Sequence, residues 1–206
     1  MLRDVASSPL ERLDAGQTEA WTRALVAEDL SEIRAVFSAQ SAFGPDIRWS
    51  PAPEDLPVPQ LRFLREYWNE HRGSRDAPEI GHIDPLKLRP ALGFIVLLDV
   101  VDGGRDFRVR LYGSVISAVS GFDLTGKLVS EHAASPYLAT FYCALYRAAY
   151  LRREPVFTQH RPAASVHTHA WHRLTLPFTN EKGEIVRFLS GNVPLNSAGR
   201  PVLLRL

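Results

Sequence analysis

Residues 109–131 read VRLYGSVISAVSGFDLTGKLVSE, and this stretch decides the fold. Apolar and polar side chains alternate as far as Tyr112, which is the pattern of a half-buried strand. At Gly113 the period changes to that of a short helix, and Gly121 and Gly126 follow closely. Glycine permits the positive φ angles of tight turns, so we expect a positive φ at Gly121 and another turn at Gly126. The stretch therefore predicts a strand followed by short helices that fold over one face of a sheet.

Strand and helix patterns on either side of this stretch indicate the fold class. Upstream, the nearly all-apolar run FIVLLDVV at 94–101 predicts a central strand, and the two glycines of Asp102-Gly-Gly-Arg105 predict a hairpin turn into a strand at 107–113. Downstream, we expect one longer helix and three strands, over 136–152, 156–163, 169–178 and 185–193. Two blocks of strands with the helices gathered between them indicate an α+β fold, and they argue against a dinucleotide-binding fold.

The first 58 residues are interpreted as an N-terminal helical extension and a proline-rich tether. Residues 18–38 have apolar side chains at helical spacing and predict one helix. Its apolar stripe consists of Trp21, Leu25, Leu30, Ile33, Val36 and Phe37. Several prolines in 43–60 predict an extended tether, because proline lacks a backbone donor and disfavours helix in the residue before it. We place the extension over 1–58 and the folded domain over 59–206, beginning with a helix at 60–71.

Bulk composition narrows the functional classes. The chain has 206 residues and a net charge of +1, which gives no electrostatic case for binding nucleic acid. Its single cysteine, Cys143, excludes a disulfide within the chain and favours a reducing compartment. No run approaches the roughly 18 apolar residues of a membrane span, and the N-terminus lacks the apolar core of a signal peptide. We therefore expect a cytoplasmic protein without a membrane span.

The order of elements and the opening stretch resemble the PAS family of sensory domains, and more closely a group of short, often stand-alone bacterial PAS-like proteins. The matching pieces are IDPLKLRPALGFIVLLDV (83–100), FRVRLYGSVISAVSGFDLTGK (107–127), HRLTLPF (172–178) and IVRFLSG (185–191). The resemblance covers about residues 60–195. It implies a five-stranded antiparallel sheet with short helices on one face, to which the residues add the N-terminal helical extension.

The resemblance also implies a sensory or regulatory role without catalysis. PAS domains hold ligands beneath their short helices, so we expect an unidentified small molecule to bind between the sheet and residues 113–150. Strand alternation and the family pattern give the expected lining: Val109, Leu111, Ile116, Phe122, Tyr142, Leu174, Leu176 and Phe188. No cofactor is specified by the sequence. Because no kinase, cyclase or DNA-binding module is recognisable, signalling is expected through contacts with a protein that acts in trans.

Two other interpretations stay open. One is a ligand-free interaction or dimerisation module with a filled core. The other is a metal-binding protein centred on HTHAWH at 167–172, where His167 and His169 would share one face of a strand and can bind zinc, nickel or copper. No nearby carboxylate or thiol completes a coordination sphere, which favours a polar end of a hairpin instead.

Individual residues suggest two PAS cofactors only weakly. Cys143 lacks the asparagine-cysteine-arginine motif of light-sensing flavin PAS domains, so we expect a buried, unreactive side chain. His132 is the candidate in the helical region for holding a haem. No serine, histidine and acid have a spacing that predicts contact, so no catalytic residue is assigned.

Three arginines, Arg110, Arg173 and Arg187, alternate into apolar strands. One that points into the pocket would hold a carboxylate or a phosphate through its planar guanidinium group. The alternative is an exposed sheet face on which the arginines pair with Asp99 or Glu184.

The apolar stripe of the helix at 18–38 needs a cover, because soluble monomers usually avoid large exposed apolar patches. N-terminal helices of PAS domains commonly pack on the sheet or on a second copy. We therefore expect this segment to cover the outer face of the sheet and to help build a homodimer.

Overall fold

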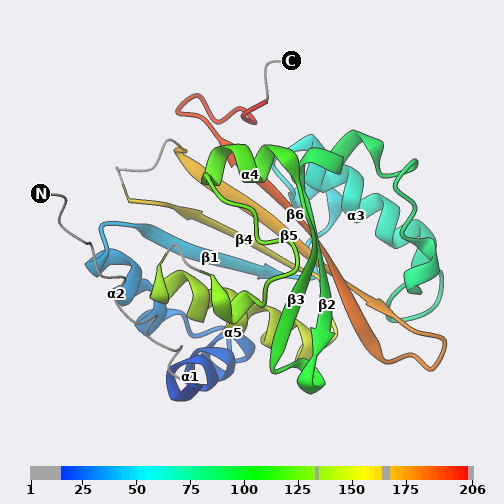
Figure 1. Ribbon diagram of the computed structural model, residues 1–206, viewed down its shortest axis with the longest axis horizontal. Coiled ribbons are helices and arrows are strands. Elements are labelled where there is room, and N and C mark those ends of the chain that lie inside the picture. Colours follow the sequence, from blue (N-terminus) through cyan, green and yellow to red (C-terminus); the bar gives the residue numbers. More distant parts are fainter. Residues whose placement is uncertain (1–14, 133–134, 164–167, 204–206) are drawn as a thin grey trace, which may run out of the picture.

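A computed structural model describes residues 15–132, 135–163 and 168–203, and an antiparallel sheet forms its centre (Figure 1). Six described strands lie in the order β1-β4-β5-β6-β2-β3. They are β1 (Phe43–Trp49), β2 (Ile95–Val101), β3 (Asp106–Tyr112), β4 (Val156–Arg161), β5 (Ala170–Thr179) and β6 (Ile185–Leu195). The α+β fold and all five expected strands are confirmed. The expected strand number was one too low, because β1 joins the sheet from the N-terminal segment.

Helices cover both faces of this sheet (Figure 1). The α-helices are α1 (Ala15–Val26), α2 (Ser31–Ala39), α3 (Pro59–Arg72), α4 (Ser114–Ser120) and α5 (Pro136–Arg152). Short 3-10 helices are η1 (Pro53–Asp55), η2 (Ile80–His82), η3 (Arg89–Phe94), η4 (Asp102–Gly104) and η5 (Val129–Glu131). Proline opens both α3 and α5, where its fixed φ suits the first helical position and its missing N–H has no partner to lose. The helices expected at 60–71 and 136–152 are confirmed.

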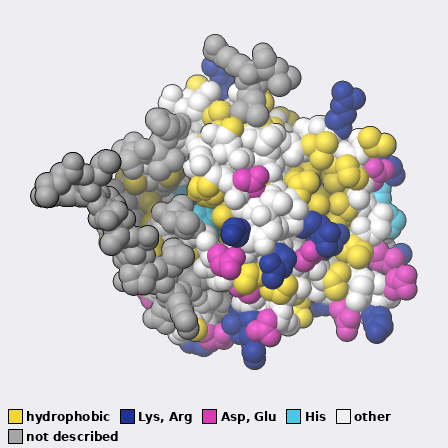
Figure 2. Space-filling model, in the orientation of Figure 1, with side chains coloured by type: hydrophobic (Ala, Val, Ile, Leu, Met, Phe, Trp, Pro, Cys, Tyr) yellow, Lys and Arg dark blue, Asp and Glu magenta, His cyan; other side chains and the backbone are white. Residues whose placement is uncertain are grey.

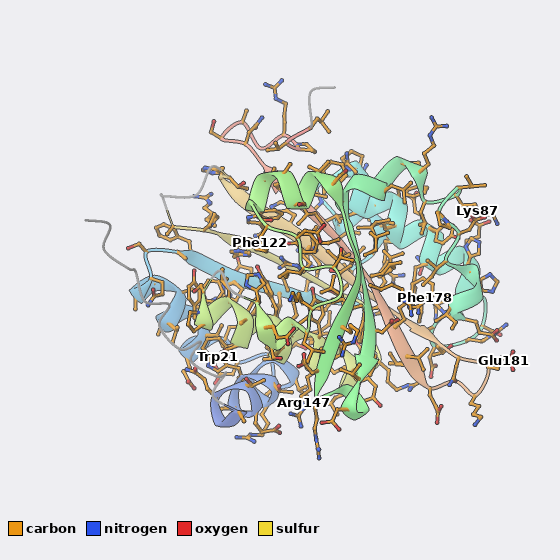
Figure 3. The ribbon with its side chains drawn as sticks, viewed as in Figure 1. Trp21, Lys87, Phe122, Arg147, Phe178 and Glu181 are labelled. Carbon is orange, nitrogen blue, oxygen red and sulfur yellow. The ribbon has the colours of Figure 1, made fainter. Side chains whose placement is uncertain are left out.

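The two sheet faces form two separate apolar cores. On one face, which we call the α5 side, side chains including Trp21 and Phe107 pack with α1, α2 and α5. On the other, the α3 side, Phe178 packs with side chains of α3 (Figure 3), and Leu174 belongs to the same core. Since successive strand residues point to opposite faces, each central strand contributes buried side chains to both cores.

The stretch at 109–131 folds largely as expected. Gly113 ends β3, α4 follows, and Gly121 has a φ of 81° at the helix C-terminus, as predicted. After the turn at Gly126 the chain returns to β3: the Val109 N–H donates to the Lys127 carbonyl at 2.9 Å, and the Gly126 N–H donates to the Val109 carbonyl at 2.7 Å. The second short helix is only the 3-10 turn η5. The segment therefore roofs the sheet and also covers part of its β3 edge.

One long N-terminal helix was a wrong prediction, because the segment is divided into α1 and α2. Glu28 has a φ of 61°, which ends the first helix. The Asp29 carboxylate accepts hydrogen bonds from the Ser31 N–H at 3.1 Å and from the Ser31 hydroxyl at 2.6 Å, which form a local turn just before the second helix. This turn interrupts the continuous apolar spacing on which the prediction relied.

The apolar stripe of this segment is covered within the chain. Trp21, Leu25, Ile33 and Phe37 are all 0% exposed and belong to the core on the α5 side. The expected position on the outer face was wrong, since α3 occupies that face. The stripe consequently needs no second copy to bury it, and the homodimer stays a prediction without this support.

The segment interpreted as a tether contains the edge strand β1. Trp49 is opposite Val156 and Arg48 is opposite Phe157 in an antiparallel pair with β4. Pro45 lies at a register shift near the start of the strand, which is a position where a sheet tolerates proline. Residues before the proposed boundary at 59 thus contribute to the same sheet as those after it.

The described surface carries mixed charge. On the face shown in Figure 2, basic and acidic side chains are interspersed among the described residues, without a broad area of one sign. Within the described helices, no segment combines the length and the apolar character that crossing a bilayer requires.

Candidate functional site

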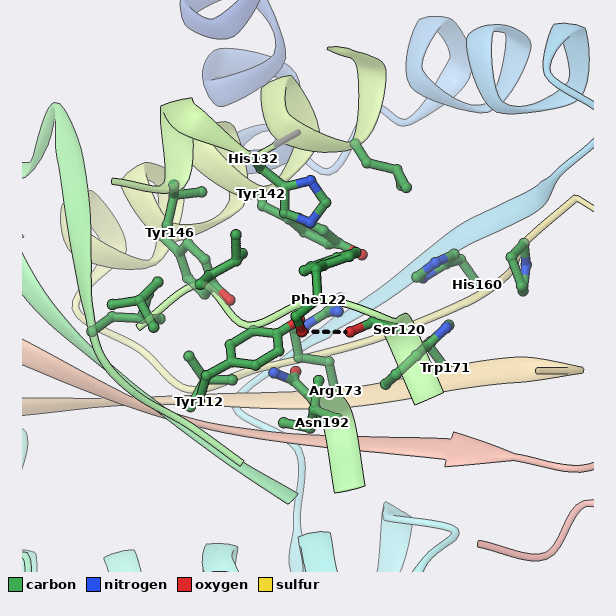
Figure 4. Close-up of a pocket in the computed structure, with 18 residues that line it drawn as sticks. Tyr112, Ser120, Phe122, His132, Tyr142, Tyr146, His160, Trp171, Arg173 and Asn192 are labelled. Atoms are coloured by element: carbon green, nitrogen blue, oxygen red, sulfur yellow. Dashed lines mark hydrogen bonds between the residues drawn. The ribbon is translucent and has the colours of Figure 1, made fainter. Parts of the chain in front are cut away.

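A cavity of about 170 Å³ lies between the sheet and its cover on the α5 side (Figure 4). Strands β2, β3, β4, β5 and β6 contribute to its floor, while α4, the segment at 121–132 and α5 form its roof and side. The apolar and aromatic lining consists of Val96, Leu98, Val109, Tyr112, Ile116, Phe122, Leu124, Val129, Leu138, Tyr142, Tyr146, Pro162 and Trp171. Ser120, His132, His160, Arg173 and Asn192 supply the other groups. A cavity of roughly 150 Å³ can hold a benzene molecule, so this space suits one ring-sized ligand.

The turn after α4 brings an aromatic wall into the cavity. Gly121 reverses the chain with its positive φ, and the Ser120 hydroxyl donates to the Phe122 carbonyl at 3.2 Å (Figure 4). The Phe122 ring centroid lies 5.0 Å from that of His132 and 6.1 Å from that of Tyr112. The glycine-punctuated stretch of sequence therefore shapes one wall of the cavity.

Arg173 brings a cation into this apolar space. The residue is only 5% exposed, and its Cζ atom lies 4.3 Å from the ring centroid of Tyr142. Its Nε and Nη1 atoms are buried and have no hydrogen-bond partner among the described residues. Burial alone would lower the pKa of Arg173, but the phenol groups of Tyr142 and Tyr146 raise it above its ordinary value. Arg173 is therefore charged at neutral pH.

Two histidines beside Arg173 are uncharged at neutral pH. Burial, together with the charge of Arg173, lowers the pKa of His160 to about 3 and that of His132 to about 4. No aspartate or glutamate is present among the described lining residues. The described cavity wall consequently carries a single positive charge.

The other two candidate arginines do not reach the cavity. The Nε atom of Arg110 donates to Asp99 at 2.8 Å, and the Nε atom of Arg187 donates to the same carboxylate at 2.7 Å. Arg110 and Arg187 therefore fit the alternative interpretation, in which arginines on the sheet pair with an acidic side chain instead of pointing into the pocket. Arg173 alone among the three lines the cavity.

Four of the eight expected lining residues lie together around the cavity: Val109, Ile116, Phe122 and Tyr142. The structure places Leu174 and Leu176 in the core on the α3 side instead. Phe188 is on the cavity side but is packed into the core, with its ring centroid 5.8 Å from that of Phe107.

Leu111 is absent from the lining because β3 is irregular. The pairing with β2 passes from Leu97 opposite Leu111 to Leu98 opposite Val109, so Arg110 is an extra residue in β3. A bulge of this kind reverses the alternation of side chains beyond it. Leu111 is therefore 36% exposed, and Tyr112 points to the cavity in its place.

Several lining residues were not selected from the sequence, among them Tyr112, His160, Trp171 and Asn192. The sequence of β5 carries a signal for its two faces. Trp171 and Arg173 are at odd positions on one face, whereas Leu174 and Leu176 are at even positions on the other. The prediction assigns the apolar pair, Leu174 and Leu176, to the pocket face. Because both faces of β5 are buried, apolar character alone does not identify the side that holds the cavity.

The remaining cofactor candidates have ordinary explanations. Cys143 is 2% exposed, as expected, and burial raises the pKa of its thiol, which makes it unreactive. His167 lies outside the described residues, His169 is exposed, and no group of three metal-ligating side chains forms in the described part of the chain. His132 lines the cavity, but a space that fits one ring has no room for the four pyrrole rings of a haem.

A comparison with protein families adds an independent finding. A family model described as a PAS domain matches residues 57–191. The match extends from the residues before α3 into β6 and includes every described lining residue except Asn192. No curated protein and no solved structure matches the chain.

Proposed function

Because the chain belongs to the PAS domain family, we propose that it is a non-enzymatic sensory domain that binds one small organic molecule in its cavity. The cavity itself carries the proposal: it is about 170 Å³ in volume, mostly apolar, and contains a few convergent polar groups. Pockets of this composition are typical of small-molecule sites, in which apolar walls supply affinity and polar groups fix orientation. Family membership supports the regulatory role.

The cover of the cavity offers a route for the signal. It consists of α4, the turn at 121–128 and η5, and these elements are too short to be stable without packing. A ligand that packs beneath them can shift the population of their arrangements only if it binds one arrangement better than another. A partner in trans would then contact the altered outer surface of the cover. A cytoplasmic setting is part of the proposal, and the buried lone Cys143 is compatible with it.

The ligand-free alternative has less support. Protein cores are close-packed, and buried polar groups in them are nearly always hydrogen-bonded. Here a cavity lies beside Arg173, two of whose nitrogen atoms have no hydrogen-bond partner among the described residues. A ligand accounts for both features, whereas an interaction module with a filled core accounts for neither.

A neutral ring-sized probe, benzyl alcohol, tests the cavity as a binding site. Titration followed by amide NMR shifts should give a saturable response at residues that line the cavity. Val109→Phe should lose most of this response, because the larger side chain fills space at the cavity floor. Leu111→Phe is the matched control, since it makes a similar change two residues along β3 at an exposed position.

The control should bind benzyl alcohol as the unmodified protein does. Equal binding by Val109→Phe would show that the probe binds elsewhere. A complete lack of saturable shifts in the unmodified protein would overturn the proposal.

A further inference from the structure

We infer that the ligand is a small monocarboxylate with a ring-sized apolar body, and that Arg173 binds its carboxylate group. This inference rests on the proposed function, because it names the ligand class of the same cavity. It depends on four observations: the burial of Arg173, its lack of an acidic partner among the described residues, the charge of the cavity and the apolar composition of the rest of the cavity wall.

Arg173 is buried without an acidic partner among the described residues. It is 5% exposed, it forms no ion pair with any described residue, and Nε and Nη1 have no hydrogen-bond partner there. Its guanidinium contacts the face of the Tyr142 ring, and a hydrogen bond links the two side chains; together these compensate only part of the lost hydration. A guanidinium does not escape burial by losing its proton, so the charge persists. An anion that enters the cavity would supply the missing interaction.

A carboxylate already performs this role elsewhere on the same sheet. Asp99 accepts hydrogen bonds from both Arg110 and Arg187, at 2.8 and 2.7 Å. Those two arginines lie nearer to solvent, yet each has an acidic partner. Arg173 is more deeply buried and has none among the described residues. Among the described residues, Arg173 on β5 is therefore the arginine that most needs a further partner.

The charge of the cavity favours a monoanion. Among the described lining residues, Arg173 is the sole arginine or lysine, and no acid opposes it. His132 and His160 are neutral because burial lowers the pKa of each. A phosphate group carries about −1.5 to −2 charges at neutral pH, so it would leave excess negative charge in an apolar space. One carboxylate balances the single guanidinium.

The rest of the wall favours an apolar body on this carboxylate. Arg173 lies on the sheet floor, and Phe122 and Trp171 supply apolar surface around the same space (Figure 4). Ile116 adds to this apolar lining. The volume of about 170 Å³ limits that body to about one ring or a short branched chain. Benzoate has the required charge, size and apolar ring, and it is therefore the probe of choice.

The test compares benzoate, benzyl alcohol and inorganic phosphate by NMR titration of the full chain at pH 7. Benzoate and benzyl alcohol share a ring and differ in charge. We expect benzoate to bind at least tenfold more tightly than benzyl alcohol, and phosphate to bind more weakly than benzoate. In Arg173→Met we expect benzoate affinity to fall tenfold or more, as is typical when a hydrogen-bonded charge loses its partner. The affinity for benzyl alcohol should stay within threefold.

Two further variants separate binding from structure. Arg187→Met removes an arginine of the same sheet outside the cavity, and benzoate affinity should stay unchanged. Arg173→Lys keeps the charge without the planar fork, and it should retain part of the preference for benzoate. The ligand-free Tm of Arg173→Met should equal or exceed that of the unmodified protein, because an apolar side chain replaces an unpaired buried charge.

Each outcome decides between the claims. If benzyl alcohol binds in the cavity and benzoate binds no more tightly, the carboxylate inference fails and the proposed function stands. If phosphate binds more tightly than benzoate, the assigned ligand class is wrong. If neither ring compound binds, both claims fail. An unchanged preference for benzoate in Arg173→Met, with a lower Tm, would assign Arg173 a structural role and overturn the inference.

Discussion

Gly113→Ala is expected to destabilise the domain by about 3 kcal/mol or more, the upper part of the range for overpacked sites. A Cβ atom at this position would lie 2.4 Å from the carbonyl oxygen of Gly93 and 3.0 Å from that of Ile95. Both contacts are with backbone, so no side-chain rotation relieves them. Gly113 has φ −60° and ψ 142°, which alanine adopts readily, and the cost is therefore steric.

Urea unfolding monitored by circular dichroism measures this cost. Gly121→Ala is the matched control, because its φ is 81° and nothing lies within 4 Å of the added Cβ atom. In Gly121→Ala the added Cβ atom causes backbone strain without a steric clash. This strain should lower the free energy of unfolding by about 1–2 kcal/mol. If Gly113→Ala were no less stable than Gly121→Ala, the backbone at the end of β3 would not lie as close to η3 as the structure places it. That approach matters for function because it fixes where α4 begins over the cavity.

Acid should destabilise the protein strongly between pH 6.5 and 4. The pKa of His160 is about 3 and that of His132 about 4 in the folded state, both lowered mainly by burial, against 6.5 as the ordinary value. The unfolded chain therefore takes up protons first as the pH falls. The contribution of these histidines is complete above about pH 6.5 and is lost as the pH falls toward the folded values. For His160 alone the full loss amounts to about 5 kcal/mol, at 1.36 kcal/mol per pKa unit.

His160→Phe isolates this contribution. Phenylalanine keeps a ring against Phe37, whose centroid is 5.9 Å from that of His160, and it has no proton to gain. Between pH 6 and 4, its unfolding free energy should fall less steeply than that of the unmodified protein, by about 1.4 kcal/mol per pH unit. His169→Phe, at an exposed position, should leave the slope unchanged. Equal slopes for His160→Phe and the unmodified protein would contradict the buried neutral state of His160.

Local sequence signals predicted much of the fold. The alternation in β3, the prolines that open α3 and α5, and the glycine turns of the opening stretch each act over a few residues. The sixth strand was missed because β1 contains Pro45 and lies in a proline-rich segment, and its pairing with β4 identifies it. Long-range pairing of this kind has no local signature.

The site was predicted less completely than the fold, for two physical reasons. The bulge at Arg110 turns the side chain of Leu111 away from the cavity and that of Tyr112 toward it. Nothing in the alternating sequence marks this bulge. Burial of β5 on both faces makes Leu174 and Leu176 look as suitable as the true lining. Arg173 was recognised as one of three possible anion-binding arginines. Its selection depended on Asp99, which pairs with the other two across neighbouring strands.

Native mass spectrometry of the full chain, as purified from cells, tests the central claim most directly. The account predicts that part of the protein carries one non-covalent small molecule, which is lost on denaturation. Its mass should be on the order of 100 Da, because the cavity of about 170 Å³ is close to the roughly 150 Å³ that holds a benzene molecule. The same excess should be absent from Val109→Phe and retained by Leu111→Phe. Identical native and denatured masses for the unmodified protein, or an equal excess in Val109→Phe, would contradict a ligand in this cavity.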